Sequence, residues 1–409
     1  MPELNVRRNT ILLSAAVAVN SCLFQLAAAV NSLTFVLITG VRGLLGLGPA
    51  IFLASSGLAA LPAGSAMDRF GRRPVIVCGF LVAALGCSLV AVATRTDSTI
   101  AVISGMALTG AAGGVALLIR AAAGDMYPPE RRARGIAYVL FGAVFGGILG
   151  PAVFSPLFAG KHLHVHALTL PWLAAGGLAL VAAAIAVFVR PDPKEIAEAI
   201  GSHDRAATQA PSASLGEILR RPGVVPALLA SLASFSVMVS VMNLTGYVVV
   251  EHHHHAQSDV FPIIGAHVLG MYALVLVIGP LVDQLGRTRS LWIGLVVMGC
   301  SCIGLAWLTS VLDTGALLFF LGLGWSLSFV AATAQLADRA LPAERGKLLG
   351  FNDQISALTG AGLALLGGLA LDTLGVAALS IGATVLVLLP LARLLRRDGA
   401  VATIAPRRT

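Results

Sequence analysis

The stretch Gly64-Ser-Ala-Met-Asp68-Arg-Phe-Gly71-Arg72-Arg73 occurs in two related versions along the chain. The second version, Gly279-Pro-Leu-Val-Asp283-Gln-Leu-Gly286-Arg287-Thr-Arg289, keeps the spacing of glycine, aspartate, glycine and arginine. Asp283 follows Asp68 by 215 positions. A further match has nearly the same offset, pairing Pro128, Glu130 and Arg131 with Pro342, Glu344 and Arg345. Two matches at one offset indicate duplication of a unit about half as long as the chain.

The composition is that of a membrane protein. The 409 residues are 57% hydrophobic and 11% charged, with a mean hydropathy of +0.90, whereas soluble proteins carry about 25% charged residues. Apolar runs of about 20 residues, the length that crosses the hydrocarbon core, recur along the chain. The first run, near 9–37, is too long for a signal-peptide core. We predict an all-α membrane protein with twelve spans, at about 10–36, 47–66, 73–94, 99–124, 136–160, 168–190, 223–250, 259–282, 288–310, 315–338, 348–371 and 374–395.

The distribution of positive charge predicts the orientation. Outside loops carry only Arg42, Arg95 and Lys161, whereas the termini and the loops assigned to the inside carry all the other basic residues except Arg120, which lies in a span. Because cytoplasmic loops are enriched in Lys and Arg, both termini are expected in the cytoplasm. The same bias accounts for the net charge of +8, so no nucleic-acid partner is implied.

The duplication and the loops predict three segments. Residues 191–222 form the longest loop and are rich in Pro, Ser, Ala and charge, which is typical of a flexible linker. We therefore predict an N-terminal six-helix bundle at 1–190, a cytoplasmic linker at 191–222 and a C-terminal six-helix bundle at 223–409. The chain contains no G-x-S-x-G, P-loop, H-E-x-x-H or convergent carboxylate pair, so an enzyme is not expected.

Two pairs of soft ligands lie in consecutive predicted spans. Met238-x-x-x-Met242 and His267-x-x-x-Met271 each place two side chains on one helix face. At 1.5 Å per residue, Met242 and His267 lie about 12 Å below the outer ends of their helices, and Met238 and Met271 about 18 Å below. Thioether and imidazole ligands suit Cu(I). The alternative is that the methionines fill gaps in the core and the histidine bonds a neighbouring helix.

Seven histidines fall in two outside loops. They are His162, His164 and His166 in one loop and His252, His253, His254 and His255 in the other. These histidines either bind metal weakly and concentrate it above the Met/His pairs, or they belong to polar loops without a role.

Gly64, Asp68, Gly71, Arg72 and Arg73 resemble the G-x-x-x-D-R-x-G-R-[KR] loop of the major facilitator superfamily. This resemblance implies two pseudo-symmetric six-helix bundles around a central cavity, with access alternating between the membrane faces. It also implies a monomer without a cofactor, in which this loop stabilises the outward-open state. Asp68 and Arg72, and Asp283 and Arg287 in the second version, are then gating residues, together with Arg120.

The two ligand pairs look like the M-x-x-x-M and H-x-x-x-M pair of bacterial major-facilitator copper importers, which supply copper for haem-copper oxidase assembly. This resemblance implies that Met238, Met242, His267 and Met271 contact copper as the transported substrate. It further implies import across the bacterial cytoplasmic membrane to a cytoplasmic copper acceptor. The chain departs from the expected pattern in its His-rich outer loops, and it has no cysteine in these two spans.

Two other functions remain open. Gly142-x-x-x-Gly146-x-x-x-Gly150-Pro151 is part of a glycine-proline motif of proton-coupled exporters of drugs or metabolites, but Val153 and Phe154 stand where a glycine pair is expected. Close helix packing through small residues also explains the run. No carboxylate is predicted at mid-depth in a span, which counts against the exporter. A copper-binding protein without transport is disfavoured by the duplication.

Overall fold

The computed structural model describes residues 2–40, 47–146, 148, 165–201, 213–249, 253–255 and 260–402. Every regular element in these ranges is helical. The first half contains α1 (Pro2–Thr39), α2 (Leu47–Phe70), α3 (Arg72–Thr96), α4 (Thr99–Leu117), α5 (Ile119–Asp125), η2 (Pro129–Arg131), α6 (Arg132–Leu140), η3 (Val165–Leu168) and α8 (Thr169–Val187). The second half contains α12 (Val224–Tyr247), α13 (Val260–Tyr272), α14 (Val275–Leu285), α15 (Arg287–Gly304), α16 (Val311–Asp338) and α17 (Arg345–Ala402). Between them lie α9 (Pro193–Gly201) and α11 (Leu215–Leu219).

Most of the predicted spans correspond to long helices. Among the described residues, eight helices are long and apolar enough to cross a membrane, or nine if α13 and α14, bent by 41°, form one span. The predicted spans 136–160, 288–310 and 348–371 are not among them. The first extends beyond the described residues, the third includes residues whose side chains lie outside the described part, and α15 carries Arg287 and Arg289 in its first turn. Residue Gly375, with a φ of 80°, divides the 58-residue α17 into two consecutive helices.

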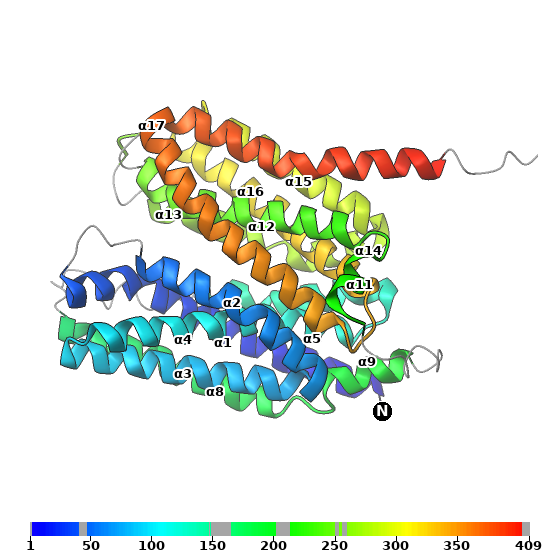
Figure 1. Cartoon of the computed structure of the whole chain (residues 1–409), viewed down its shortest axis with the longest axis horizontal. Helices are drawn as coiled ribbons and strands as arrows, with labels where there is room; N and C mark the ends of the chain where they lie inside the picture. Colours follow the sequence, from blue (N-terminus) through cyan, green and yellow to red (C-terminus); the bar gives the residue numbers. More distant parts are fainter. Residues whose placement is uncertain are drawn as a thin grey trace, which may run out of the picture.

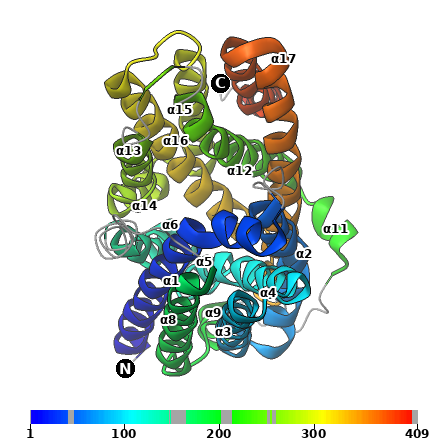
Figure 2. The same ribbon diagram turned by 90° about the vertical axis from the view of Figure 1, so that its left-hand side faces the viewer.

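The helices form two bundles, one from each half of the chain (Figures 1 and 2). In the first bundle α3 packs between α4 and α8, and in the second α15 packs against α16 and α17. The bundles meet along two pairs of helices, α2 with α17 and α6 with α14. These pairs occupy corresponding positions in the two halves, as a duplicated unit predicts.

Glycines allow the helices to approach closely at these contacts. A methyl group added at Gly64 would overlap the backbone carbonyl of Gly346, so α2 and α17 touch backbone to backbone. Gly142 lies against the backbone carbonyl of Ser14 in α1, and Gly146 lies against the side chain of Ser21. These two glycines thus serve close helix packing, whereas Gly150 and Pro151 lie outside the described residues.

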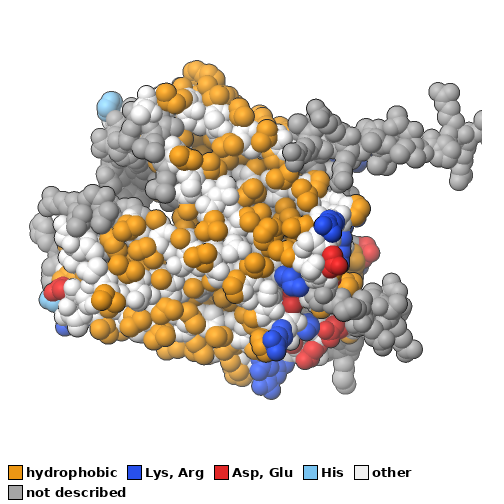
Figure 3. Space-filling model, in the orientation of Figure 1, with side chains coloured by type: hydrophobic (Ala, Val, Ile, Leu, Met, Phe, Trp, Pro, Cys, Tyr) orange, Lys and Arg blue, Asp and Glu red, His pale blue; other side chains and the backbone are white. Residues whose placement is uncertain are grey.

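Charge gathers at one end of the molecule, on the right in Figure 3, where the two repeated loops lie. We call this the basic end. Figure 1 places the N-terminus, α9 and α11 there. The flanks of the bundles expose large apolar side chains, among them Ile100, Leu170 and Leu312. Such a surface suits lipid and not water.

Replacing Gly64 by alanine should separate the bundles at the basic end, because the added methyl group has no room against Gly346. Overpacking of this kind costs about 1–3 kcal/mol. Spin labels at the exposed positions Arg69 and Arg339, one on each bundle, should report a longer distance. Gly177→Ala is the control, since nothing lies within 4 Å of its added Cβ. An unchanged distance in the Gly64 variant would contradict the role given to this contact.

Candidate functional site

A buried charge network joins the two bundles at the basic end. Arg72 donates to Asp68 at 2.6 Å and to Asp125 at 2.7 Å. Asp125 also accepts from Arg345 of the other bundle at 2.7 Å. The remaining nitrogen of Arg72, Nη2, donates to the backbone carbonyl of Pro342 at 2.8 Å. One guanidinium therefore binds two carboxylates of its own bundle and a loop of the other.

Asp68 also caps a helix of the opposite bundle. Its two carboxylate oxygens accept the backbone N–H groups of Gly346 and Lys347, at 2.8 and 2.6 Å. These are first-turn donors of α17, which have no partner within their own helix. The partial positive charge of the helix N-terminus favours a carboxylate there. Asp68 thus holds the start of α17 against the end of α2.

The second repeated loop makes the equivalent contacts, with the two bundles exchanged. Asp283 accepts from Arg287 at 2.6 Å and from the first-turn N–H groups of Ala133 and Arg134 in α6, at 3.2 and 3.0 Å. Asp338 accepts from Arg287 of its own bundle and from Arg132 of the other. Arg132 is therefore the counterpart of Arg345, one position after the residue that the sequence match suggested.

The two networks differ in burial. The side chains of Arg72 and Asp125 are fully buried, whereas those of Arg287 and Asp338 are 14% and 24% exposed. Removing one partner of a buried pair leaves an uncompensated charge, which is far costlier than the loss of an exposed pair. The first network therefore contributes more to the contact between the bundles.

Arg120 forms a third link between the bundles. Its guanidinium binds both oxygens of Asp353 in α17, and its Nε donates to Thr333 of α16 at 3.0 Å. Its charge lies 4.4 Å from the centre of the Phe329 ring, within the range of a cation–π interaction. The resemblance implied that Arg120 belongs to the gate, and in the structure it contacts two helices of the second bundle, α16 and α17.

The linker residues are tied to the same region. The Asp192 carboxylate accepts the backbone N–H groups of Arg72 and Arg73 at the start of α3, and Lys194 donates to the backbone carbonyl of Asp68. Glu344 binds Arg221 and the N–H of Ala213. Burial acts to raise the pKa of Glu344, but hydrogen bonds, first that from Arg221, outweigh it and hold the pKa below its ordinary value. This contact is therefore fully present above the ordinary pKa of glutamate.

A central cavity of about 400 Å³ lies between the bundles, away from the basic end. Aromatic and sulfur-containing side chains dominate its wall. The lining residues are Phe24, Ala27 and Asn31 of α1, Phe52 and Leu53 of α2, Met106 and Thr109 of α4, Trp172 of α8, and Met238, Val239 and Met242 of α12. No charged side chain of the described residues lines it.

Two polar side chains in the wall differ in their bonding. Asn31 is 8% exposed, and its Oδ1 has no hydrogen-bond partner in the described part of the chain. Thr109, in contrast, donates to the Gly105 carbonyl at 2.8 Å. A buried carbonyl oxygen without a donor costs free energy. The Asn31 oxygen is therefore available to a donor group of a molecule in the cavity.

The structure places the four predicted copper contacts in two different surroundings. Met238 and Met242 line the central cavity, but His267 and Met271 do not. α12 packs mainly against α17, and α13 mainly against α16. Nδ1 of the fully buried His267 lies 2.8 Å from the Leu318 carbonyl of α16, while its Nε2 has no partner among the described residues. The described residues include no group of three His, Cys, Asp or Glu side chains able to hold a metal.

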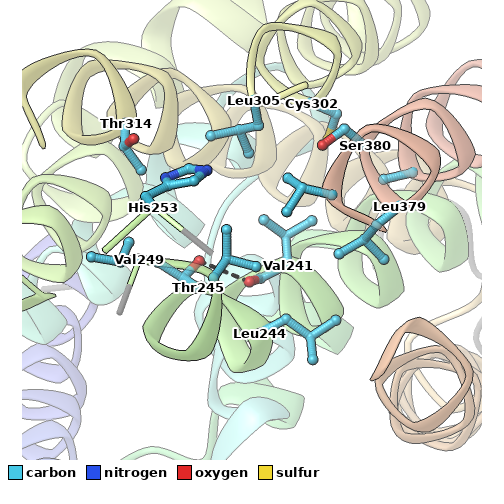
Figure 4. A pocket seen from close by; sticks show the side chains of 13 residues that line it. Val241, Leu244, Thr245, Val249, His253, Cys302, Leu305, Thr314, Leu379 and Ser380 are labelled. Atoms are coloured by element: carbon cyan, nitrogen blue, oxygen red, sulfur yellow. Dashed lines mark hydrogen bonds between the residues drawn. The ribbon is translucent and has the colours of Figure 1, made fainter. Parts of the chain in front are cut away.

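Several loop histidines bond to the protein itself. His166 Nδ1 lies 2.8 Å from the Thr94 carbonyl and His255 Nε2 lies 2.7 Å from that of Thr309. His253 lines a small cavity of about 40 Å³ together with Cys302, Thr314 and Ser380 (Figure 4). A space of this size suits a water molecule and not an organic ligand. His162, His164 and His252 lie outside the described residues.

The family follows from a comparison with known proteins. A model of the Major Facilitator Superfamily matches residues 13–365. The chain belongs to this superfamily. As a superfamily member it is a multi-pass membrane transporter and not an enzyme. Two solved structures share the fold over 95% of the chain, each with a TM-score of 0.74: the human organic anion transporter MFSD10, 18% identical over 99% of its length, and the Escherichia coli fucose:proton symporter FucP, 14% identical over 98%.

Two of three curated relatives have names that indicate what they transport or resist, and these two names differ. The Riboflavin transporter RfnT of Brucella anthropi is 30% identical and aligns over 97% of this superfamily member and 98% of its own length. The Multidrug resistance protein 2 of Bacillus subtilis is 25% identical, over 79% and 78% of the two lengths. An uncharacterized transporter of the same type from Bacillus subtilis, YddS, is 29% identical over 86% and 81%. None of these names mentions copper.

Sequence reasoning had not assigned roles to several residues that the structure brings together. Asp125, Asp338 and Asp353 belong to no motif that the sequence analysis singled out, and neither do Asn31, Phe52 and Trp172. The matching offset could have identified part of this set, because Asp125 and Asp338 are separated by nearly the same distance as the two repeated loops. Nothing comparable marks the cavity residues.

Replacing Asp125 by asparagine should open the basic end, because the neutral amide leaves both Arg72 and Arg345 without their shared counter-charge. Breaking a buried pair in this way costs about 3–5 kcal/mol. Labels at Arg69 and Arg339 should move apart, and the thermal unfolding temperature should fall. Glu198→Gln is the matched control, since Glu198 only faces Lys194 at 4.0 Å and is 43% exposed. Equal effects of the two substitutions would refute the assigned role of the first network.

Proposed function

We propose that this superfamily member carries a neutral organic molecule with a flat aromatic part across the membrane by alternating access. The single observation that carries the proposal is the wall of the central cavity. Its volume of about 400 Å³ lies within the range of small-molecule sites, roughly 300–1,000 Å³. A mostly apolar wall with few polar groups is typical of such sites.

The aromatic side chains of the wall suit a flat ligand. Phe24 and Phe52 pack edge to face with ring centres 5.5 Å apart, and Trp172 is fixed by a hydrogen bond from its Nε1 to Thr34 at 2.9 Å. Rings held in this way offer preformed surfaces for stacking. The Asn31 oxygen adds one acceptor for an N–H or O–H group of the ligand. The resemblance to a riboflavin transporter along nearly the whole chain supports the same class of substrate.

The absence of charge in the described wall disfavours a charged substrate. Moving an ion into an apolar site without a counter-charge is expensive, and no carboxylate, lysine or arginine of the described residues lines the cavity. A neutral or nearly neutral molecule avoids that cost. Proton-coupled export of drugs or metabolites remains compatible with this site. The direction of transport and its coupling to protons depend on the alternating conformations, and the composition of the wall does not determine either.

The orientation follows from the positive-inside rule. The basic end, with both repeated loops, is expected to face the cytoplasm. The charge networks then close the cytoplasmic side, and the central cavity belongs to a state that receives substrate from outside. Asp68, Arg72, Asp283 and Arg287 act as gating residues in this proposal, because their contacts must break before the cavity can open inward.

Phe52→Ala should reduce uptake of riboflavin, used as a fluorescent probe, into vesicles that contain the purified protein. Loss of a stacking surface costs about 0.5–1.5 kcal/mol beyond the buried area, which predicts at least a several-fold weaker apparent affinity. Asn31→Ala should add a loss of similar size. Phe188→Ala is the control, because Phe188 is 66% exposed and does not line the central cavity.

Uptake should also be measured with and without an imposed proton gradient. If vesicles containing the wild-type protein take up no more riboflavin than empty vesicles, a panel of drugs and dyes tests the exporter class. If uptake occurs but Phe52→Ala and Phe188→Ala behave alike, the cavity is not the binding site.

Copper uptake is the second candidate, supported by one specific observation. The cavity presents the sulfur-bearing side chains of Met238 and Met242, and the buried His267 keeps Nε2 without a partner among the described residues. Thioethers bind Cu(I) without losing a proton. Under this second hypothesis the substrate is copper, which binds Met238, Met242, His267 and Met271 and is released to a cytoplasmic acceptor.

Radioactive copper distinguishes the two candidates. Under the copper hypothesis, cells expressing Met238→Leu or His267→Gln should accumulate several-fold less copper than the wild type, because a ligand is lost while volume is nearly kept. Met67→Leu is the control, since Met67 is buried in α2 away from the cavity. Under the organic-solute proposal, expression of the wild-type protein leaves copper accumulation unchanged.

A further inference from the structure

A second, larger hollow lies on the flank of the first bundle at the basic end, and we call it the flank groove. Its volume is about 1110 Å³. Its walls come from α1, the junction of α5 and α6, α6 and the residues after it, Ile200 of α9, and, from the second bundle, Leu276 of α14. It shares no lining residue with the central cavity. The proposed transport function therefore does not use it.

The inner wall of the flank groove is apolar, and several of its side chains are exposed on the protein surface. Ile11, Tyr138 and Phe145 line it and are 59%, 38% and 49% exposed. Phe145 packs edge to face on Phe141, with ring centres 5.6 Å apart. On a span-bearing bundle such exposed apolar side chains face lipid. The groove is thus a hollow in the lipid-facing surface.

The mouth of the groove carries positive charge. Arg7 and Arg131 both line it and are both exposed. Neither takes part in an ion pair within the described residues, and no Asp or Glu of these residues lines the groove. Their sequence neighbours behave differently: Arg8 donates to the Arg190 carbonyl, and Arg132 binds Asp338. With no carboxylate of the described residues in an ion pair with either of them, the two arginines complement an anion.

The length of the groove matches one leaflet of a membrane. Along α1 its wall runs from Arg7 through Ile11 and Ala15 to Ala18. Eleven residues at 1.5 Å each span about 16 Å, and half of a hydrocarbon core of about 30 Å is about 15 Å. The small side chains of Ala15 and Ala18 leave room at the deep end. The groove thus has the reach of one acyl chain, with the charged mouth at headgroup level.

We infer that the flank groove binds an anionic phospholipid from the leaflet at the basic end. The phosphate lies between Arg7 and Arg131, and an acyl chain follows α1 past Ile11 toward Ala18. A free phosphate would use only the mouth and leave the long apolar wall uncovered. Because Leu276 belongs to the second bundle, the bound lipid touches both bundles on the side where α6 meets α14.

Titration of the full-length purified protein with phosphatidylglycerol or phosphatidylcholine, followed by native mass spectrometry, tests this inference. The wild type should retain phosphatidylglycerol in preference to phosphatidylcholine. Since each basic residue near a membrane surface contributes about a fivefold factor, Arg7→Gln with Arg131→Gln should weaken that binding about 30-fold. Phosphatidylcholine binding should not change. The control Arg289→Gln removes an exposed arginine of the same end that does not line the groove.

The apolar wall needs a test of its own. Ala15→Phe should fill the deep end and weaken phosphatidylglycerol binding without changing charge, and Phe145→Ser, at an exposed position, serves if the first variant does not fold. Glycerol 3-phosphate should not compete with the lipid. Competition by glycerol 3-phosphate would identify a site for free phosphate and overturn the lipid assignment. Equal retention of both lipids, or unchanged retention by the double arginine variant, would overturn it as well.

Discussion

The carboxylates of Asp68 and Asp283 each hold the first turn of a helix from the opposite bundle, and the closed end of the molecule depends on this exchange. Each aspartate is itself held by an arginine four residues later. Each of these arginines shares a second aspartate with an arginine that crosses from the other bundle. Helix N-termini, guanidinium groups and carboxylates therefore neutralise one another at the contact between the bundles. The glycine contact between α2 and α17 brings the backbones close enough for this to happen.

The central cavity follows a different principle. Its wall relies on ring surfaces and thioethers, with one buried amide oxygen, and the described residues contribute no charge to it. Among the described residues, the ion pairs between the bundles thus lie apart from the central cavity, whose wall is shaped by packing. This separation lets a substrate of little charge occupy the cavity without disturbing the ion pairs.

Much of the architecture was predictable from the sequence, because two copies of a charged loop at one offset report a duplicated bundle. The repeated loop singled out Asp68 and Arg72, but their ion pair spans the break at Gly71 between α2 and α3, so helix spacing does not predict it. The cavity could not, since Asn31, Phe52 and Trp172 come from three helices and look individually like lipid-facing or core residues. His267 and Met271 do share a face of α13, but that face meets α16, and sequence spacing cannot choose between neighbouring helices. Their role with Met238 and Met242 stays a prediction.

The two charge networks are related by symmetry but not in their exposure to solvent. Arg72 and Asp125 are sealed, whereas Arg287 and Asp338 are in partial contact with water. Ions in solution screen exposed pairs far more than buried ones. The junction of α6 and α14 is therefore the more sensitive of the two to the ionic strength of the surrounding solution. Two halves with the same fold thus hold their contact with unequal dependence on salt.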